Sequence, residues 1–370
     1  MVENLKRARF ILVLASCVLT AYGFIILYST TQPLVLGHQL FVKQCIWLGI
    51  ALVAFFLSSF INLNKMQAYG SWIGYVTVAL LVSVLIPGLS RSIKGAHRWI
   101  ELGGLRLQPS EPAKIGFILF FAYFLTHHMK DLNDFFKGFL RPAAVVGCFC
   151  FLLILEPDFG TTALFGTVAA ILLFVKGVRL RFILPTILGA SLVFAIAVYF
   201  NPVRLNRITA FLDLENNRLT GAYQLWQSLI AFASGGWTGC GLGQGRQQFF
   251  FLPEAHTDFI GAILAEELGI CHMLVVLFCF ALIAFYGLKI VRYQSQPFLF
   301  FVGLGIVCFL TLQALFNLGV ITGLLPTKGI ALPFLSYGGS HLLTNFCFIG
   351  LLVNLTRPIY SPLNLLNSSQ

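Results

Sequence analysis

The feature that most constrains this chain is a series of apolar runs, each close to the length that crosses a lipid bilayer. A helix rises about 1.5 Å per residue, so about 20 apolar residues span roughly 30 Å of hydrocarbon. Of the 370 residues, 58% are hydrophobic and only 10% are charged, which places the chain outside the soluble range. We therefore predict an all-α polytopic membrane protein with ten transmembrane helices. The runs lie at about residues 10–29, 40–60, 71–90, 110–127, 142–156, 159–175, 181–200, 258–287, 297–322 and 338–356.

The basic residues predict how the chain is oriented. Short cytoplasmic loops of membrane proteins are enriched in Lys and Arg. With the N-terminus inside, the cytoplasmic segments hold about half of these cations, including the cluster Lys6, Arg7 and Arg9. We therefore predict that both termini are cytoplasmic. The net charge of +11 would suggest a nucleic-acid partner for a soluble chain, but we predict none for a chain in a membrane.

Several cations fall on the predicted outer side, against this tendency. Long loops translocate largely regardless of charge, so topology alone could account for some of them. We favour the alternative, in which these cations bind an anionic ligand. They are Arg91, Lys94, Arg98 and Arg106 in one loop, Arg204, Arg207, Arg218 and Arg246 in another, and Lys328 in a third.

One connection, residues 201–257, is far longer than the others. It contains an amphipathic stretch at 222–233 and then a glycine-rich run at 235–245. The glycines lack the GxGxxG spacing and a Walker lysine, so we favour a close-packed turn over a nucleotide-binding loop. We predict a single membrane domain over residues 1–370, in which 201–257 forms a large extracytoplasmic loop between helices seven and eight with short interfacial helices.

Charged residues at the start of the predicted fourth helix form the first candidate site. Ser110 fits an N-cap and Pro112 fits the first helical turn. Glu111 and Lys114 then stand three residues apart on one face, where free helix amides and a lysine favour a phosphate or diphosphate. Alternatively, Lys114 extends to the membrane interface with Glu111 as its intrahelical partner.

Residues 252–259, Leu-Pro-Glu-Ala-His-Thr-Asp-Phe, place a carboxylate at the start of the predicted eighth helix. Asp258 lies there at the outer mouth, where it could act as a general base toward a hydroxyl group or serve only as an N-cap. Glu266 and Glu267 lie about 12 Å deeper by helical rise. Ionisable groups at membrane depth are often functional, but we favour a structural role for this pair, bonding to neighbouring helices or capping a broken helix.

Residues 323–340, between the predicted ninth and tenth helices, contain two prolines and several glycines. This composition predicts a re-entrant or surface loop. Irregular backbone at membrane depth is tolerated only where protein buries it or water reaches it. We therefore expect the loop to line the same cavity as Asp258, with Lys328 as a second phosphate ligand.

These three blocks resemble the hallmark motifs of the SEDS family, which includes FtsW, RodA and SpoVE, and the resemblance covers almost the whole chain. Its most specific parts are residues 252–259 and 333–340, the latter reading Pro-Phe-Leu-Ser-Tyr-Gly-Gly-Ser. Lys328, in Leu-Pro-Thr-Lys-Gly, is typical of FtsW rather than RodA. The chain departs from the family pattern at Pro112, at Glu156 where glutamine is common before Pro-Asp, and at His341 where serine is typical.

The resemblance implies a peptidoglycan glycosyltransferase that polymerises lipid II into glycan strands at the outer face of the bacterial cytoplasmic (inner) membrane during cell division. Asp258 would be the general base and undecaprenyl diphosphate the leaving group. The expected partners are a monofunctional class B penicillin-binding protein transpeptidase and division-complex membrane proteins. A divalent cation, Mg or Mn, near Glu111 or Asp258 is a family expectation, and no other cofactor is predicted. The expected substrate- and diphosphate-binding residues are Arg106, Glu111, Lys114, Arg246, His256, Lys328, Ser336 and Tyr337.

Three alternatives stay open at the level of the sequence. One is a flippase that moves lipid II, with Glu266 and Glu267 as a polar path through the membrane. Another is an elongation-type polymerase of the RodA kind. The third is a non-catalytic scaffold for division proteins, in which Asp258 could be replaced without effect on glycan synthesis.

Overall fold

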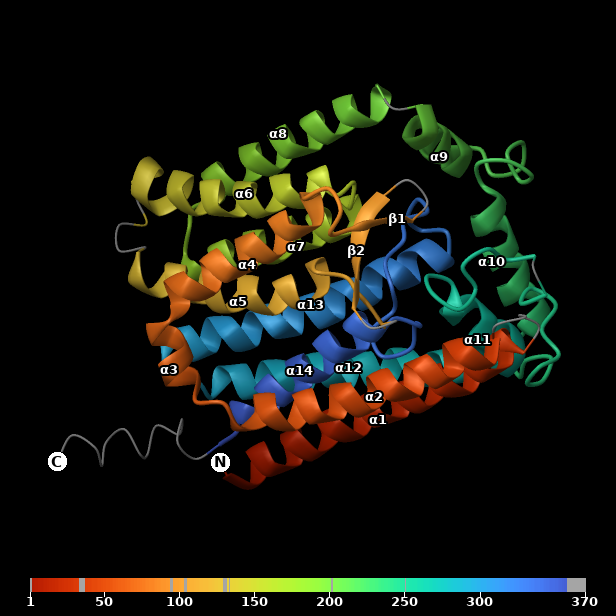
Figure 1. Cartoon of the computed structure of the whole chain (residues 1–370), viewed down its shortest axis with the longest axis horizontal. Coiled ribbons are helices and arrows are strands. Elements are labelled where there is room, and N and C mark those ends of the chain that lie inside the picture. The colour runs from red at the N-terminus through yellow and green to blue at the C-terminus, as the bar shows by residue number, and fades with distance from the viewer. Residues whose placement is uncertain are drawn as a thin grey trace.

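The computed structural model describes residues 2–32, 37–93, 96–102, 105–128, 132, 134–200, 202–249 and 251–357. In this part of the chain, long helices run side by side along one axis and form an elongated bundle (Figure 1). Lys94, one of the predicted outer cations, lies outside the described residues. The side chains of Arg91 and Arg204 are likewise not described.

The long helices account for the predicted membrane spans. Six described helical segments are long and apolar enough to cross a membrane, and α4, α8 and α14 are shorter apolar helices. A polytopic helical membrane protein is thereby confirmed, while the count of ten spans stays a prediction. The helices of 15 residues or more are α1 (Val2–Thr31), α2 (Gly37–Phe60), α4 (Gly70–Leu85), α5 (Ser110–His127), α6 (Arg141–Leu155), α7 (Phe159–Lys176), α8 (Leu180–Tyr199), α12 (Ile270–Arg292), α13 (Pro297–Ile321) and α14 (Gly339–Asn354). The shorter ones are α3 (Leu63–Ala68), the π-helical turn η1 (Phe136–Leu140), α9 (Pro202–Leu212), α10 (Tyr223–Gly235) and α11 (Ile260–Leu268).

Helix α13 forms the centre of the bundle. In its most apolar stretch 72% of the residues are buried, against 17% for α2, so α13 is a core helix and α2 a peripheral one. A helix that is apolar all round needs such a buried position or a lipid environment. The amide side chains of Gln313 and Asn317 on α13 are buried and need hydrogen-bond partners within the protein.

The predicted eighth span, 258–287, is not one continuous helix. The structure divides it at Gly269, whose φ of 82° ends α11 before α12 begins. A Cβ at Gly269 would lie 2.4 Å from the backbone nitrogen of Gly239, so the glycine-rich loop packs directly on the break. Two backbone segments, residues 236–241 and 266–271, bond to each other at the break. The bonds are Cys240 N–H to Glu266 O, Gly241 N–H to Glu267 O, Ile270 N–H to Gly236 O and Cys271 N–H to Trp237 O.

A small antiparallel sheet, absent from the all-α prediction, precedes α5. Its strands β1 (Arg91–Ile93), β2 (Ala96–Leu102) and β3 (Leu105–Leu107) are ordered β1-β2-β3. The register pairs Glu101 with Arg106, so opposite charges face each other across the strands.

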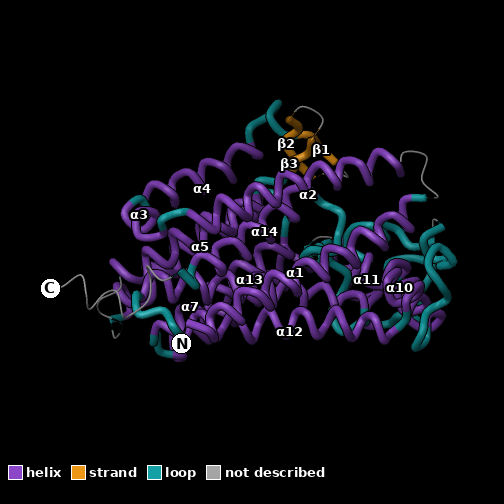
Figure 2. Tube along the Cα trace, turned by 90° about the horizontal axis from the view of Figure 1, so that it is seen from below, coloured by secondary structure: helices purple, strands orange, loops and turns teal. Residues whose placement is uncertain are grey.

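The two ends of the bundle differ in content. Helix α1 begins, and α3 lies, at one end, while α10 and α11 lie at the other (Figures 1 and 2). Helix α14 ends beside α3, because the Asn354 amide donates to the carbonyls of Ser58 and Ile61. The described starts and ends of the bundle are thus on one side, as the topology prediction requires. Which side is cytoplasmic stays a prediction.

Candidate active site

The backbone around Asp258 is held by donors from elsewhere in the chain. This segment is not helical, so its carbonyls need partners from outside the segment. Three successive carbonyls each accept one hydrogen bond, from the loop after α13 or from α13 itself. The bonds are Tyr337 N–H to His256 O (2.9 Å), Ser336 Oγ–H to Thr257 O (2.7 Å) and Asn317 Nδ2–H to Asp258 O (2.7 Å).

The carboxylate of Asp258 is half-buried and meets the loop that carries Lys328. A Cβ placed on Gly329 would lie 2.8 Å from Asp258 Oδ2. The ammonium of the neighbouring Lys328 lies over the ring of Phe194 on α8, 5.1 Å from its centroid. Burial lowers the pKa of Lys328 below its ordinary value. The two loops that the sequence placed in one cavity therefore lie together.

Each of these loops contains one residue other than glycine with positive φ. They are Glu254 at 59° and Phe334 at 67°. Such conformations cost on the order of 1–3 kcal/mol and persist only where surrounding contacts fix them. The loop after α13 also packs against α1, because a Cβ at Gly23 would lie 2.7 Å from the Cα of Leu335. The backbone of both loops is therefore fixed in its conformation by contacts with the rest of the protein.

Lys114 points into the bundle instead of outward. Its Nζ lies 2.8 Å from Glu111 Oε1 and 2.9 Å from Gln313 Oε1, and only 2% of the residue is exposed. The expected outward convergence of Lys114 with the helix amides is therefore not observed, while the pairing with Glu111 is. The predicted N-cap is also shifted, since Pro109 holds that position and Ser110 begins the helix. A role of Lys114 in diphosphate binding stays a prediction.

The Lys114–Glu111 pair belongs to a larger buried network between α5, α13 and α14. His341 Nδ1 lies 3.2 Å from Glu111 Oε2, and Asn345 Nδ2 lies 3.1 Å from His341 Nε2. Gln313 closes the network, because its Nε2 donates to the carbonyl of Ala331 at 2.9 Å. The charged pair is thereby connected to the backbone next to the Asp258 site.

The donor set does not fit a divalent cation at Glu111. Both carboxylate oxygens of Glu111 are occupied by Lys114 and His341, and a cationic neighbour opposes a second cation. In the described ranges, no group of three or more His, Cys, Asp or Glu side chains could hold a metal ion, including around Asp258. A divalent cation near Asp258 stays a prediction, since Mg²⁺ can be held by one carboxylate together with substrate phosphates.

Arg106 and Tyr337 form the polar rim beside this site. Arg106 is exposed on β3, and its charge opposes the effect of burial, which raises the pKa of the Tyr337 phenol. The Tyr337 ring meets His256 edge-on, with centroids 5.8 Å apart. The backbone N–H of Gln108 donates to Ser340 Oγ at 3.2 Å and joins the end of the sheet to α14.

Ser336, expected to bind substrate, is fully buried. Its hydroxyl donates to Thr257 O and accepts from Leu332 N–H at 2.7 Å, so both hydrogen-bonding functions serve the protein. Ser336 therefore joins the segment before α11, through Thr257, to the loop after α13, through Leu332. Its direct contact with a substrate stays a prediction without support from this arrangement.

Glu266 and Glu267 anchor the glycine-rich loop. Glu266 Oε1 accepts from the backbone N–H groups of Arg246 (2.9 Å) and Gln247 (3.3 Å). Glu267 Oε1 accepts from Gly243 N–H at 3.1 Å and from Ser29 Oγ at 2.6 Å. The Arg246 side chain itself is exposed. These contacts match the structural interpretation of the acidic pair and leave the flippase alternative without its proposed polar path.

The turn between α6 and α7 carries a second pair of acidic residues. Asp158 caps α7 by accepting from Thr161 N–H, and Arg98 donates to the carbonyls of Glu156 and Pro157. The carboxyl of Glu156 is 1% exposed and has no hydrogen-bond partner. Burial first, and the nearby Asp158 charge second, raise its pKa to about 8, although Arg98 acts in the opposite sense. Glu156 is therefore largely protonated at neutral pH.

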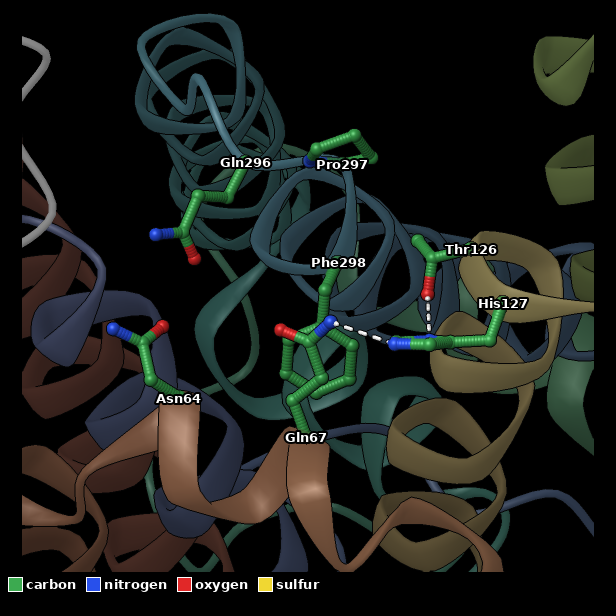
Figure 3. A pocket seen from close by; sticks show the side chains of 7 residues that line it. All are labelled: Asn64, Gln67, Thr126, His127, Gln296, Pro297 and Phe298. Carbon is green, nitrogen blue, oxygen red and sulfur yellow. Dashed lines mark hydrogen bonds between the residues drawn. The ribbon is translucent and has the colours of Figure 1, made fainter. Parts of the chain in front are cut away.

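An open polar pocket lies at the other end of the bundle, near the start of α13 (Figure 3). Gln67 Nε2 lies 3.4 Å from His127 Nε2 at its edge. Pro297, which lines the pocket, is 20 residues from Asn317 along α13, about 30 Å by helical rise. The pocket belongs to neither predicted site. Its lining residues are Asn64, Gln67, Thr126, His127, Gln296, Pro297 and Phe298.

Sequence reasoning missed the two amide side chains of α13, Gln313 and Asn317. Gln313 and Asn317 stand four residues apart on one helix face and bond to the carbonyls of Ala331 and of Asp258 and Ile330, respectively. The available signal was the presence of amide side chains in a run of otherwise apolar residues. Such residues in membrane helices normally bond to neighbouring segments.

The fold and the site together define a polytopic membrane protein with a half-buried carboxylate, that of Asp258, held between two loops at the end of the bundle. A family model described as a cell cycle protein, FTSW_RODA_SPOVE, matches residues 9–360. The chain therefore belongs to the FtsW/RodA/SpoVE family.

Curated relatives and solved structures agree with this membership. A protein of Allochromatium vinosum named "Probable peptidoglycan glycosyltransferase FtsW" is 37% identical over 354 residues, covering 93% of this chain and 88% of that protein. A protein of the same name from Coxiella burnetii is 39% identical over 319 residues, covering 85% and 86%. A structure described as "Structural coordination of polymerization and crosslinking by a peptidoglycan synthase complex" matches with a TM-score of 0.79 and 26% identity, covering 94% of this chain and 97% of that one. A mutant of the rod shape determining protein RodA of Thermus thermophilus matches with a TM-score of 0.71 and 25% identity, covering 95% and 97%.

Proposed function

We propose that this protein is an FtsW-type peptidoglycan glycosyltransferase that polymerises lipid II at the outer face of the cytoplasmic membrane during cell division. The observation that carries the proposal is the placement of Asp258. Its carboxylate stands beside Gly329, and the backbone of residues 256–258 is fixed by three hydrogen bonds, at the end of the bundle opposite α3 (Figure 1). The names of the relatives support the same activity.

In the proposed reaction Asp258 is the general base. The 4-hydroxyl of the acceptor N-acetylglucosamine attacks the anomeric carbon of the N-acetylmuramic acid at the end of the growing strand. Asp258 takes the hydroxyl proton as the new glycosidic bond forms, and the bond to the diphosphate breaks with inversion at that carbon. Undecaprenyl diphosphate leaves with the bonding electron pair.

Cations at the rim complement the charge that develops on the leaving diphosphate. Arg106 is exposed on β3, and Lys328 is adjacent to Gly329 at the carboxylate. Cations already in position stabilise such charge in the transition state without solvent reorganisation. Lys114 is not in this group, because Glu111 and Gln313 hold its ammonium inside the bundle. We assign Lys114 a structural contribution to the site.

The proposal includes location and partners. Asp258 and the long loop would face the extracytoplasmic side, and both termini the cytoplasm. A class B penicillin-binding protein transpeptidase would bind there and cross-link the new strands, as the similarity to a peptidoglycan synthase complex supports. Other membrane proteins of the division complex would complete the assembly at the division site.

The test is polymerisation of lipid II by purified protein with its transpeptidase partner. Asp258→Asn removes the base but keeps the shape of the side chain, so glycan strands should no longer form. Asp213→Asn is the matched control, because Asp213 is an exposed carboxylate on the same long loop whose bonds are local. Activity of Asp258→Asn equal to the wild type, at equal folding, would remove the proposed base and favour a scaffold.

A further inference from the structure

We propose that Asn317 of α13 is a positioning residue that fixes the distance between the backbone of Asp258 and the strand of loop that faces its carboxylate. This inference rests on the proposed function. The residue carries no charge and is not expected to touch the substrate.

The two amide protons of Asn317 bridge two separate segments. Nδ2 donates to Asp258 O at 2.7 Å and to Ile330 O at 2.6 Å. An asparagine amide has two N–H donors, so both are used, one on each segment. The second bond is made to Ile330, which directly follows Gly329. It therefore also restrains Gly329, whose Cα faces the Asp258 carboxylate.

The surroundings of Asn317 make this bridge rigid. The residue is 1% exposed and sits on the most buried helix of the bundle. Water therefore cannot replace either bond, and side-chain motion is restricted by packing. Of the three donors that hold carbonyls 256–258, only Asn317 comes from a regular helix, so it ties the catalytic loop to the core.

The same chain contains a matched arrangement away from the site. Asn354 on α14 is also fully buried, and its Nδ2 also donates to two backbone carbonyls, those of Ser58 (2.8 Å) and Ile61 (2.7 Å). In both residues Oδ1 is buried without a hydrogen-bond partner. A buried aspartate that faces two carbonyl oxygens takes up a proton and donates at most one hydrogen bond. Replacing either asparagine by aspartate therefore breaks one of the two bonds with almost no change in shape. Only the position relative to Asp258 differs.

The experiment compares Asn317→Asp and Asn354→Asp in lipid II polymerisation with the transpeptidase partner, with thermal unfolding in detergent measured alongside. We expect both variants to unfold at lower temperature. Asn317→Asp should reduce kcat by about 100-fold, the effect of a misplacement on the order of 1 Å, with KM for lipid II nearly unchanged. Asn354→Asp should keep the kcat of the wild type per folded molecule.

Asn317→Leu, which retains no donor at a similar size, is the second variant and should lose more kcat than Asn317→Asp. Wild-type kcat in a folded Asn317→Asp protein would overturn the inference, as would an equal loss in Asn354→Asp. If neither Asn317 variant folds, the residue is a folding determinant and the positioning role is rejected. Activity in Asp258→Asn would instead reject the proposed function, so the two failures are distinguishable.

Discussion

Gly329 faces the carboxylate of Asp258 so closely that a methyl group on its Cα would lie 2.8 Å from Oδ2. This contact is shorter than van der Waals separation, and the carboxylate is the more easily displaced partner. Gly329→Ala should therefore fold normally but move the Asp258 side chain from its position. We expect kcat for lipid II polymerisation to fall by about 10- to 100-fold, with little change in thermal unfolding.

Gly166→Ala on α7 provides the control for that prediction. A Cβ at Gly166 would meet nothing within 4 Å, so the same chemical change should leave turnover unaltered. Full activity of Gly329→Ala would show that the carboxylate works equally well from another position. The tight contact would then have no catalytic meaning.

Replacement of Lys114 should act mainly on stability. Lys114→Met removes the ammonium 2.8 Å from the buried Glu111 carboxylate, and breaking a buried ion pair typically costs about 3–5 kcal/mol. The measurement is thermal or denaturant unfolding in detergent. The double variant Glu111→Gln with Lys114→Met should recover much of this loss, because no buried charge is left without its partner.

The diphosphate-binding alternative makes the opposite prediction for the same residue. If Lys114 contacts the substrate, Lys114→Met should weaken binding of lipid II, and the double variant should not restore it. Binding measured on the folded fraction separates the two roles. A large loss of affinity with unchanged stability would contradict the structural assignment.

Glu156 should make stability depend on pH. Its pKa is raised to about 8 in the folded protein from an ordinary value of 4.5. Between these pH values the folded state retains a proton that the unfolded state has lost, so stability falls as pH rises through the window. One pKa unit corresponds to about 1.4 kcal/mol, and the total is therefore a few kcal/mol. Glu156→Gln should remove this dependence and be more stable than the wild type near pH 8.

The comparison is made by thermal unfolding across that pH range. Glu215→Gln replaces an exposed carboxylate and should keep the pH profile of the wild type. A wild-type profile in Glu156→Gln as well would mean that Glu156 ionises normally, with water or a cation reaching its buried oxygens.

Lys328 should contribute to use of the lipid diphosphate. Lys328→Met keeps a flexible chain over the Phe194 ring but removes the charge beside Gly329. We expect kcat/KM for lipid II to fall by about 10-fold or more, since a charged hydrogen bond contributes about 1.5–3 kcal/mol. Lys289→Met is the control, because Lys289 also lies over an aromatic ring, Tyr286, but at the last turn of α12. Equal kinetics of Lys328→Met and wild type would exclude a role of this cation.

The membrane fold was predictable because bilayer thickness imposes a length on apolar runs. The juxtaposition of Asp258 with the loop of Lys328 was also predictable, because irregular backbone at membrane depth must collect in one protected place. The break at Gly269 was only one of two options at the level of the sequence, because Glu266 and Glu267 could either cap a broken helix or bond to neighbouring helices. It becomes visible only when the backbone of residues 236–241 is seen bonded to it.

The direction in which a side chain points was the second feature that could not be predicted from the sequence. The spacing of Glu111 and Lys114 predicted their pairing, but spacing does not say which way that helix face points. Burial against Gln313, a residue about 200 positions later, decides it. Likewise the partners of Asn317 lie on two loops whose positions depend on the whole bundle. In the local sequence, the only sign of such long-range contacts is an amide residue among apolar ones.

The hydrogen-bonded break between α11 and the glycine-rich loop has a mechanical consequence. Trp237 is 69% exposed in the loop segment that pairs with residues 266–271. Helix α11 is short, and its first residue, Ile260, stands two positions after Asp258. Helix α11, nine residues or about two and a half turns long, therefore connects the exposed loop segment at Trp237 to the segment of Asp258 by a short path that includes none of the long helices.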